Sequence, residues 1–130
     1  MMPQLGMSAT VDGEWGVLVV SGEVDLAVAP ELRASLAELV DVGVRHLVVD
    51  LRPVTFLDST GIGVLVAAAK RLHDADVTGS LRLVCTDERV LRVLRLTGVL
   101  AVFLLHATVD QARAAEGHPA ADPASEERGG

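Results

Sequence analysis

The residues best suited to chemistry lie together in the segment Asp58-Ser59-Thr60-Gly61-Ile62-Gly63, where two hydroxyl side chains follow a carboxylate. Such side chains accept hydrogen bonds from the unpaired backbone N–H groups at a helix start, so Asp58, Ser59 or Thr60 is expected to cap a helix. Catalysis by Asp25, Asp58 and Ser59 together is an alternative, but general acid–base work requires a pocket and shifted pKa values. The sequence shows neither.

Two glycines follow these hydroxyls. Gly61 and Gly63 fall in the first turn of the expected helix, where each costs about 1 kcal/mol relative to alanine. A segment selected only for helix stability would not place them there. Without side chains they would leave the surface around the hydroxyls bare, so that another protein can approach the backbone closely. A capped helix start with no further role is the alternative interpretation.

No other group indicates a catalytic, cofactor or metal site. The four histidines lie in unrelated segments without paired spacing: His46, His73, His106 and His118. Gly61-Ile62-Gly63 lacks the third glycine of a dinucleotide-binding fingerprint, and there is neither a phosphate-binding P-loop nor a G-x-S-x-G segment. Cys85 lies in an apolar stretch and is expected to be a small buried side chain. The sequence therefore predicts no catalytic residue, no cofactor and no metal.

Composition narrows the class of partner. The chain has 130 residues, 18 Asp and Glu against 11 Lys and Arg, a net charge of -7 and one cysteine. One domain is expected at this length. The acidic balance argues against nucleic acid or an anionic membrane as the main partner. Residues 96–109 are too few and too interrupted for a membrane span, and the N-terminus does not indicate a secretory signal. We expect a soluble, cytoplasmic protein.

Alternating periodicities predict the elements that must position the hydroxyls. Asp12-Gly13 is a hairpin signal between two strands, and the later strands alternate with amphipathic helices. This order, roughly ββαβαβαβα, predicts one α/β domain: a mixed sheet, antiparallel in its first hairpin and largely parallel elsewhere, covered by about four helices. The domain is expected over residues 8–116. Residues 117–130, rich in Pro, Gly and charge, are predicted to be a disordered tail.

Several segments, in order, resemble the STAS domain of bacterial anti-sigma factor antagonists. They are Gly22-Glu23-Val24-Asp25, then Asp50-Leu51, then residues 56–65, which include Asp-Ser-Thr-Gly-Ile-Gly. Leu96-Thr97-Gly98-Val99 also fits the pattern ahead of the family's last strand. The similarity spans residues 17–115, and its most specific part is the Asp-Ser-Thr-Gly-Ile-Gly segment in its strand-to-helix setting.

The resemblance implies a partner switch. In that family the serine after the aspartate, here Ser59, is phosphorylated by an ATP-dependent anti-sigma factor that is also a serine kinase. The unphosphorylated protein binds this anti-sigma factor and frees a sigma factor, and a PP2C-type phosphatase resets the cycle. Thr60 is the neighbouring hydroxyl and is not the expected acceptor. The implied partner-binding residues are Asp25, Asp58, Ser59, Thr60, Gly61, Ile62 and Gly63.

Elementary electrostatics favours such a switch. A phosphate adds roughly -1.5 to -2 charges at one point of the surface. A helix N-terminus tolerates an anion, so the fold should survive. A partner packed over Ser59 would have to bury an unmatched dianion beside Asp58, so the interface should fail. The alternative function is a STAS scaffold or accessory domain that binds a protein, a lipid-transport component or a nucleotide without phosphorylation.

Overall fold

The computed structural model describes residues 6–76, 78–101 and 103–115. Its strands are β1 (Gly6–Asp12), β2 (Trp15–Val24), β3 (His46–Asp50), β4 (Val54–Leu57), β5 (Ser80–Val84) and β6 (Leu104–His106). Its helices are α1 (Ala29–Asp41), α2 (Ser59–Ala75), α3 (Glu88–Leu96), the short 3-10 helix η1 (Val99–Ala101) and α4 (Val109–Ala114). The expected tail, residues 117–130, and the expected domain end at residue 116 lie outside the described residues.

The strands form one 6-stranded mixed sheet of order β1-β2-β3-β5-β6, with β4 pairing with β2 off this path. Among the described residues, the β1–β2 hairpin is antiparallel and the other strand pairs are parallel. It turns at Gly13, whose φ of 61° is a left-handed conformation that glycine adopts without strain. The expected fold class is confirmed: a mixed α/β domain with an antiparallel first hairpin and parallel pairing elsewhere.

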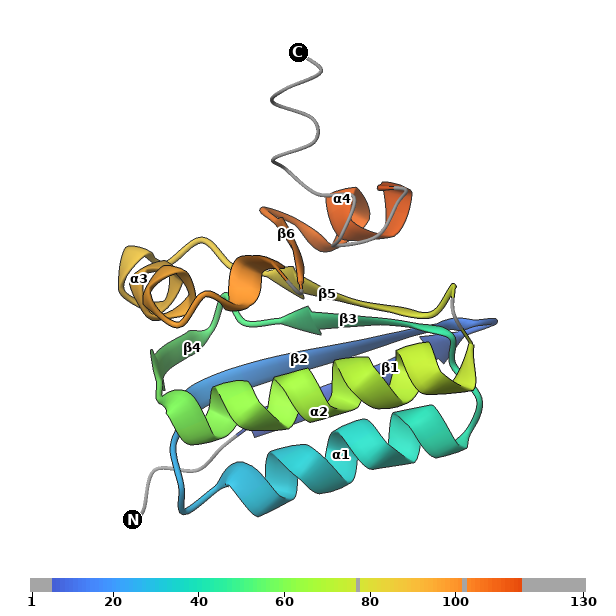
Figure 1. Cartoon of the computed structure of the whole chain (residues 1–130), viewed down its shortest axis with the longest axis horizontal. Helices are drawn as coiled ribbons and strands as arrows, with labels where there is room; N and C mark the ends of the chain where they lie inside the picture. Colours follow the sequence, from blue (N-terminus) through green and yellow to red (C-terminus); the bar gives the residue numbers. More distant parts are fainter. Residues whose placement is uncertain (1–5, 77, 102, 116–130) are drawn as a thin grey trace.

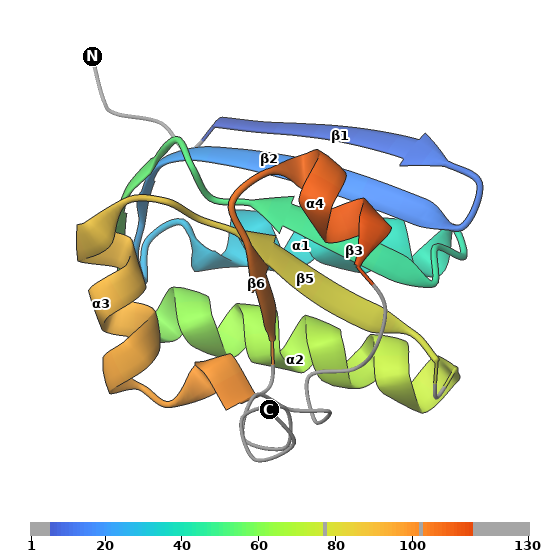
Figure 2. The same ribbon diagram turned by 90° about the horizontal axis from the view of Figure 1, so that it is seen from above.

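The helices divide between the two faces of the sheet. Figure 1 shows α1 and α2 side by side beneath the sheet and the short α4 above it, while α3 lies at one end. Seen from above, α4 crosses over β3 and β5 (Figure 2). The face covered by α1 and α2 holds the main core. There the fully buried Leu18, Leu36 and Leu65 pack together from β2, α1 and α2. The opposite face has a small second cluster of Val48, Val84 and Ala112 beneath α4.

One strand was not expected. The predicted order ββαβαβαβα has no strand between β3 and α2, but β4 forms there and changes the observed order to ββαββαβ before α3. β4 has only 4 residues and begins directly after Pro53. Its inner residues Thr55 and Phe56 are both exposed while its ends are buried, so no alternating pattern marks it as a strand.

The long strand β2 organises this part of the fold. Its first half, Trp15 to Val19, pairs with β3, and its last residues, Gly22 to Val24, pair with β4. All of these pairings are parallel, so the carboxyl ends of β2 and β4 meet at one edge of the sheet. Loops that follow parallel strands converge there, and the loop after each strand leads into α1 or α2.

Candidate partner-binding site at the start of helix α2

Asp58 caps helix α2. Its backbone is extended, and its side-chain Oδ1 accepts hydrogen bonds from the backbone N–H groups of Thr60 at 3.0 Å and Gly61 at 3.1 Å. The sequence left the cap open between Asp58, Ser59 and Thr60, and the structure assigns it to Asp58. The carboxylate thereby satisfies two of the N–H groups that a helix start leaves unpaired.

Ser59 is the first residue of α2 and is exposed. Because Asp58 performs the capping, the Ser59 hydroxyl is not needed to satisfy the helix start. The neighbouring side chains are less accessible than Ser59: Thr60 is half-buried, and Ile62 is 5% exposed. Of the two adjacent hydroxyl residues, the more accessible one is therefore the serine.

The two glycines of the first turn differ in their surroundings. A Cβ atom on Gly61 would lie 2.6 Å from Val24 Cγ1 and 2.8 Å from Leu57 Cδ1, because the helix start packs closely on the ends of β2 and β4. Gly63 is exposed, and a Cβ there would meet nothing within 4 Å. A bare surface was expected from both. It is found at Gly63, whereas Gly61 is buried and serves helix–sheet packing.

The Asp25 loop lies beside this helix start. The backbone N–H of Asp58 donates to the carbonyl of Val24 at 3.2 Å, so the residues that follow β2 and β4 leave the sheet together. Asp25 Oδ1 accepts from the N–H groups of Ala27 at 3.0 Å and Val28 at 3.3 Å, which holds the loop into α1 in a fixed turn. The structure thus brings Asp25 and Asp58, predicted from distant segments, to one edge of the sheet.

Two large apolar side chains are exposed at the same edge, and the sequence analysis assigned neither to the site. Leu26, directly after Asp25, is 71% exposed, and Phe56, two residues before Asp58, is 47% exposed. Leu57, between Phe56 and the cap, is instead buried. We call Asp25, Leu26, Phe56, Asp58 and Ser59 the rim. Its mixture of apolar and acidic groups on one surface suits contact with another protein.

An ion pair lies in the turn that leads from β3 into β4, the strand that carries Phe56. Asp50, at the end of β3, is 4% exposed and receives hydrogen bonds from Arg52 Nε at 2.9 Å and Arg52 Nη2 at 2.7 Å. Burial works to raise the pKa of Asp50, but the side-chain and backbone hydrogen bonds from Arg52 outweigh it and hold that pKa below its usual value. The pair closes the turn that carries the chain from β3 into β4.

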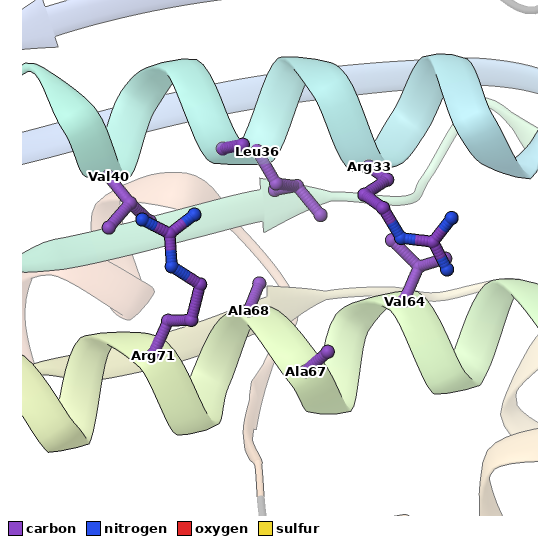
Figure 3. A pocket seen from close by; sticks show the side chains of 8 residues that line it. Arg33, Leu36, Val40, Val64, Ala67, Ala68 and Arg71 are labelled. Atoms are coloured by element: carbon purple, nitrogen blue, oxygen red, sulfur yellow. The ribbon is translucent and has the colours of Figure 1, made fainter.

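A hollow runs between α1 and α2. This groove of about 300 Å³ is lined by Arg33, Leu36, Ala37, Val40, Val64, Ala67, Ala68 and Arg71. Figure 3 shows an arginine from each helix at opposite ends of an apolar floor. The Arg71 guanidinium is paired with Asp41 at 3.0 Å. The lining consists of two arginines and six apolar side chains, and it shares no residue with the rim.

The described residues were compared with the requirements of a metal site and of a membrane-spanning helix. Among residues 6–76, 78–101 and 103–115, no group of three or more His, Cys, Asp or Glu side chains is placed to hold a metal ion. Within the same ranges, no helix has the length and apolar character needed to cross a bilayer. Cys85 is 4% exposed, and burial raises the pKa of its thiol, as suits a packing residue.

Comparison with known proteins places this geometry in a family. A family model described as the STAS domain matches residues 7–112, which include the sheet, the rim and most of α4. The chain belongs to the STAS domain family. The resemblance drawn from the sequence is thereby confirmed.

Relatives of this STAS domain have a common name. A Staphylococcus aureus protein called anti-sigma-B factor antagonist is 30% identical over 95 residues, covering 73% of this chain and 86% of that protein. A Bacillus subtilis protein of the same name is 38% identical over 80 residues, covering 62% and 71%. The crystal structure of an anti-sigma factor antagonist from Mycobacterium paratuberculosis superposes with a TM-score of 0.78 at 29% identity, covering 85% of this chain and 92% of that one.

Proposed function

We propose that this STAS domain is an anti-sigma factor antagonist controlled at Ser59. When unphosphorylated, it binds an anti-sigma factor that is also a serine kinase and so frees a sigma factor. Phosphorylation of Ser59 ends the binding, and a PP2C-type phosphatase restores it. The observation that carries this proposal is the exposed Ser59 hydroxyl at the start of α2, on a rim where Asp58 already performs the capping. The names of the relatives support the general role.

The local hydrogen bonds explain why a phosphate on Ser59 would not be neutralised by its own helix. Asp58 already occupies the N–H groups of Thr60 and Gly61. A phosphate would add roughly -1.5 to -2 charges beside that carboxylate, near Asp25 and in a chain of net charge -7. The phosphate charge would therefore remain unneutralised by the helix start and exposed on the surface. Because the cap and the packing of Gly61 do not involve the Ser59 side chain, the fold would remain unchanged.

The rim also explains why binding would be lost. Leu26 and Phe56 offer apolar surface that a partner would cover, and a covered Ser59 would be removed from water. A dianion in that position must either be matched by the partner or lose its hydration at a cost of several kcal/mol. A loss of about 3 kcal/mol already weakens binding by more than 100-fold. We infer that the interface, and not the fold, is what the modification switches.

The proposed activity is binding and not catalysis. The Asp25 side chain accepts hydrogen bonds from its own loop and the Asp58 side chain from the first turn of α2, and neither residue lines the groove between α1 and α2. The kinase and phosphatase chemistry would belong to the partners. Since an anti-sigma factor regulates transcription, we infer that the protein acts in the cytoplasm, without direct contact with nucleic acid.

The decisive experiment uses the cognate anti-sigma factor kinase and ATP. We expect one phosphate on the wild-type chain, located at Ser59 by mass spectrometry, and none on Ser59→Ala. Thr60→Ala is the matched control and should be phosphorylated normally. In binding assays without ATP, Ser59→Ala should bind like wild type, whereas Ser59→Asp should bind at least about 100-fold more weakly.

Two results would contradict this mechanism. One is a phosphate found on Thr60 alone, and the other is equal affinity of the Ser59→Asp and Ser59→Ala variants for the kinase. Binding that persists while no phosphate is transferred would support the second candidate, an accessory interaction domain. That candidate uses the same exposed rim, but Ser59 would then be one of its surface residues and not a site of phosphorylation.

A further inference from the structure

The inference concerns Arg82, a buried cation on the face of the sheet opposite to α1 and α2. Arg82 lies in β5 and is 4% exposed. Its Nη1 donates to the carbonyl oxygen of Ala112 at 2.7 Å and to that of Ala115, and its Nε donates to Ser80 Oγ at 3.1 Å. These carbonyls belong to the C-terminal end of α4, which carries the negative end of the helix dipole. Arg82 thus anchors α4 to the sheet.

The serine hydroxyl that receives Arg82 is shared with a histidine. His46 Nδ1, on the adjacent strand β3, lies 2.9 Å from Ser80 Oγ. A guanidinium can only donate, so the hydroxyl oxygen accepts from Arg82, and its own proton is free to be donated to His46 Nδ1. That bond requires a lone pair on Nδ1, which is present when His46 is neutral and carries its proton on Nε2.

Protonation of His46 would break this arrangement. Nδ1 would become a donor, so two cations would both donate to one hydroxyl oxygen, and the Ser80 proton would lose its acceptor. The structure disfavours that state: burial and then Arg82 lower the pKa of His46. His106, on the neighbouring strand β6, behaves similarly, because its buried Nε2 has no partner among the described residues and burial and Arg82 lower its pKa as well.

Other charges act on His46 from the β1–β2 turn, from the residue before it and from the end of α2. Glu14 and Asp76 raise its pKa, whereas Arg45 adds to the lowering. Trp15 of β2 stacks on the His46 ring at 4.7 Å between centroids. The guanidinium of Arg82 lies 5.0 Å from the centre of the Trp15 ring.

The helix itself contributes one more cation. Arg113 of α4 lies 5.3 Å from the centre of the Trp15 ring and pairs with Asp12 of β1 at 3.4 Å. Among the ion pairs of the described residues, none involves Arg82. In this region, Arg45 and Arg113 are thus paired with carboxylates, whereas Arg82 is held by hydroxyl and carbonyl oxygens.

We propose that the docking of α4 is a proton-sensitive latch, in which neutral His46 keeps Ser80 and Arg82 in place to hold the helix, and protonation of His46 loosens it. The direction follows from linkage: the released state, in which His46 is hydrated, binds the proton at a higher pH than the docked state. Docking is complete above the usual histidine value of about 6.5 and weakens as the pH falls below it. The latch and Ser59 lie near opposite ends of β2, so the two act on different surfaces.

The chain carries its own reporter for this movement, because Trp15 is its one tryptophan and lies beneath α4. The measurement is acrylamide quenching of Trp15 between pH 8 and pH 5, on the whole protein. The quenching constant is used in place of brightness, since a stacked imidazolium quenches tryptophan by itself. Hydrogen exchange of residues 109–115, corrected for the intrinsic rate at each pH, gives a second readout.

We expect both readouts to rise below about pH 6.5, with α4 protection falling about tenfold for each unit by which the pKa of His46 differs between docked and released states. His46→Gln should remove most of the transition. His73→Gln, on the exposed face of α2, is the matched control and should leave it unchanged.

A flat response in wild type, or a full transition in folded His46→Gln, would overturn the proposal. Should His46→Gln fail to fold by circular dichroism, the wild-type protein still decides the question by NMR. The titration of the His46 ring must then share its midpoint with the exchange of α4. Separate midpoints would also reject the latch.

Discussion

At the scale of single residues, alanine substitutions at the two glycines in the first turn of α2 should change the free energy of unfolding in opposite directions. Gly61→Ala places a Cβ 2.6 Å from Val24 Cγ1 and 2.8 Å from Leu57 Cδ1, so it should lower the free energy of unfolding by about 1–3 kcal/mol. Gly63→Ala meets open space on an exposed helix and should raise that free energy by about 0.5–1 kcal/mol. Urea unfolding of the two variants measures both. Equal effects of the two substitutions would contradict the packing assigned to Gly61.

The cap gives a second prediction at this scale. Asp58→Ala removes the acceptor for the N–H groups of Thr60 and Gly61 and should cost about 0.5–2 kcal/mol of stability. Asp58→Asn keeps a side-chain oxygen in the same place and should cost much less. Thermal unfolding of the pair separates loss of the cap from loss of the charge. If the asparagine variant were as unstable as the alanine variant, charge and not capping would be the dominant contribution.

The rim was only partly predictable from the sequence. Residue types narrowed the cap to Asp58, Ser59 and Thr60, because side-chain oxygens of these types accept hydrogen bonds from the N–H groups at a helix start. The exposure of Leu26 was not predictable, since a leucine in a short turn is buried or exposed according to what covers the turn. The difference between Gly61 and Gly63 is likewise tertiary: it depends on Val24, which is 37 positions away from Gly61 in the chain.

At the scale of elements, the turn between β3 and β4 depends on Asp50. Asp50→Asn leaves the Arg52 guanidinium without its carboxylate and should lower stability at pH 7 by about 1–3 kcal/mol. Because the pKa of Asp50 is lowered in the folded state, its contribution is present above the unfolded value of about 3.9 and is lost as the pH falls through the folded pKa. The difference between wild type and variant should therefore shrink from pH 7 to pH 3 in urea unfolding.

Asp41→Asn provides the control for that experiment. Asp41 also pairs with an arginine, Arg71, at 3.0 Å, but the side chains are 67% and 51% exposed. Exposed pairs contribute little, so this substitution should change stability by less than about 0.5 kcal/mol at either pH. A comparable loss in both variants would mean that the burial of Asp50 has no energetic consequence.

Elements with strong periodicity were predictable, and β4 was not. The helices α1, α2 and α3 follow apolar spacings that bury residues such as Leu32, Leu65 and Leu94. β4 is defined by its pairing with the end of β2, a non-local contact, and its four residues show no alternation. Short strands of this kind are determined by their neighbours, so local pattern is a poor guide to them.

For the whole molecule, a substitution on the rim should weaken partner binding while leaving the stability of the fold almost unchanged. Leu26→Ser removes an apolar side chain that is 71% exposed on the rim, so affinity for the anti-sigma factor should fall about tenfold or more while stability changes by less than about 0.5 kcal/mol. Val42→Ser is the matched control, since Val42 is 68% exposed just beyond the other end of α1. It should bind like wild type. Equal loss in both variants would place the interface elsewhere.

The division of β2 between two partners has a consequence for the position of Asp25. Residues 15–19 are held between β1 and β3, whereas the register shifts between Gly22 and Glu23 where β4 takes over, and Gly22 has a φ of 98°. The first half of β2 is therefore held on both sides by neighbouring strands, and Gly22 connects it to the last residues of the strand, which pair with β4 and lead into Asp25. Any other residue at Gly22 would be strained at this φ, so the position of Asp25 at the sheet edge depends on a glycine three residues before it.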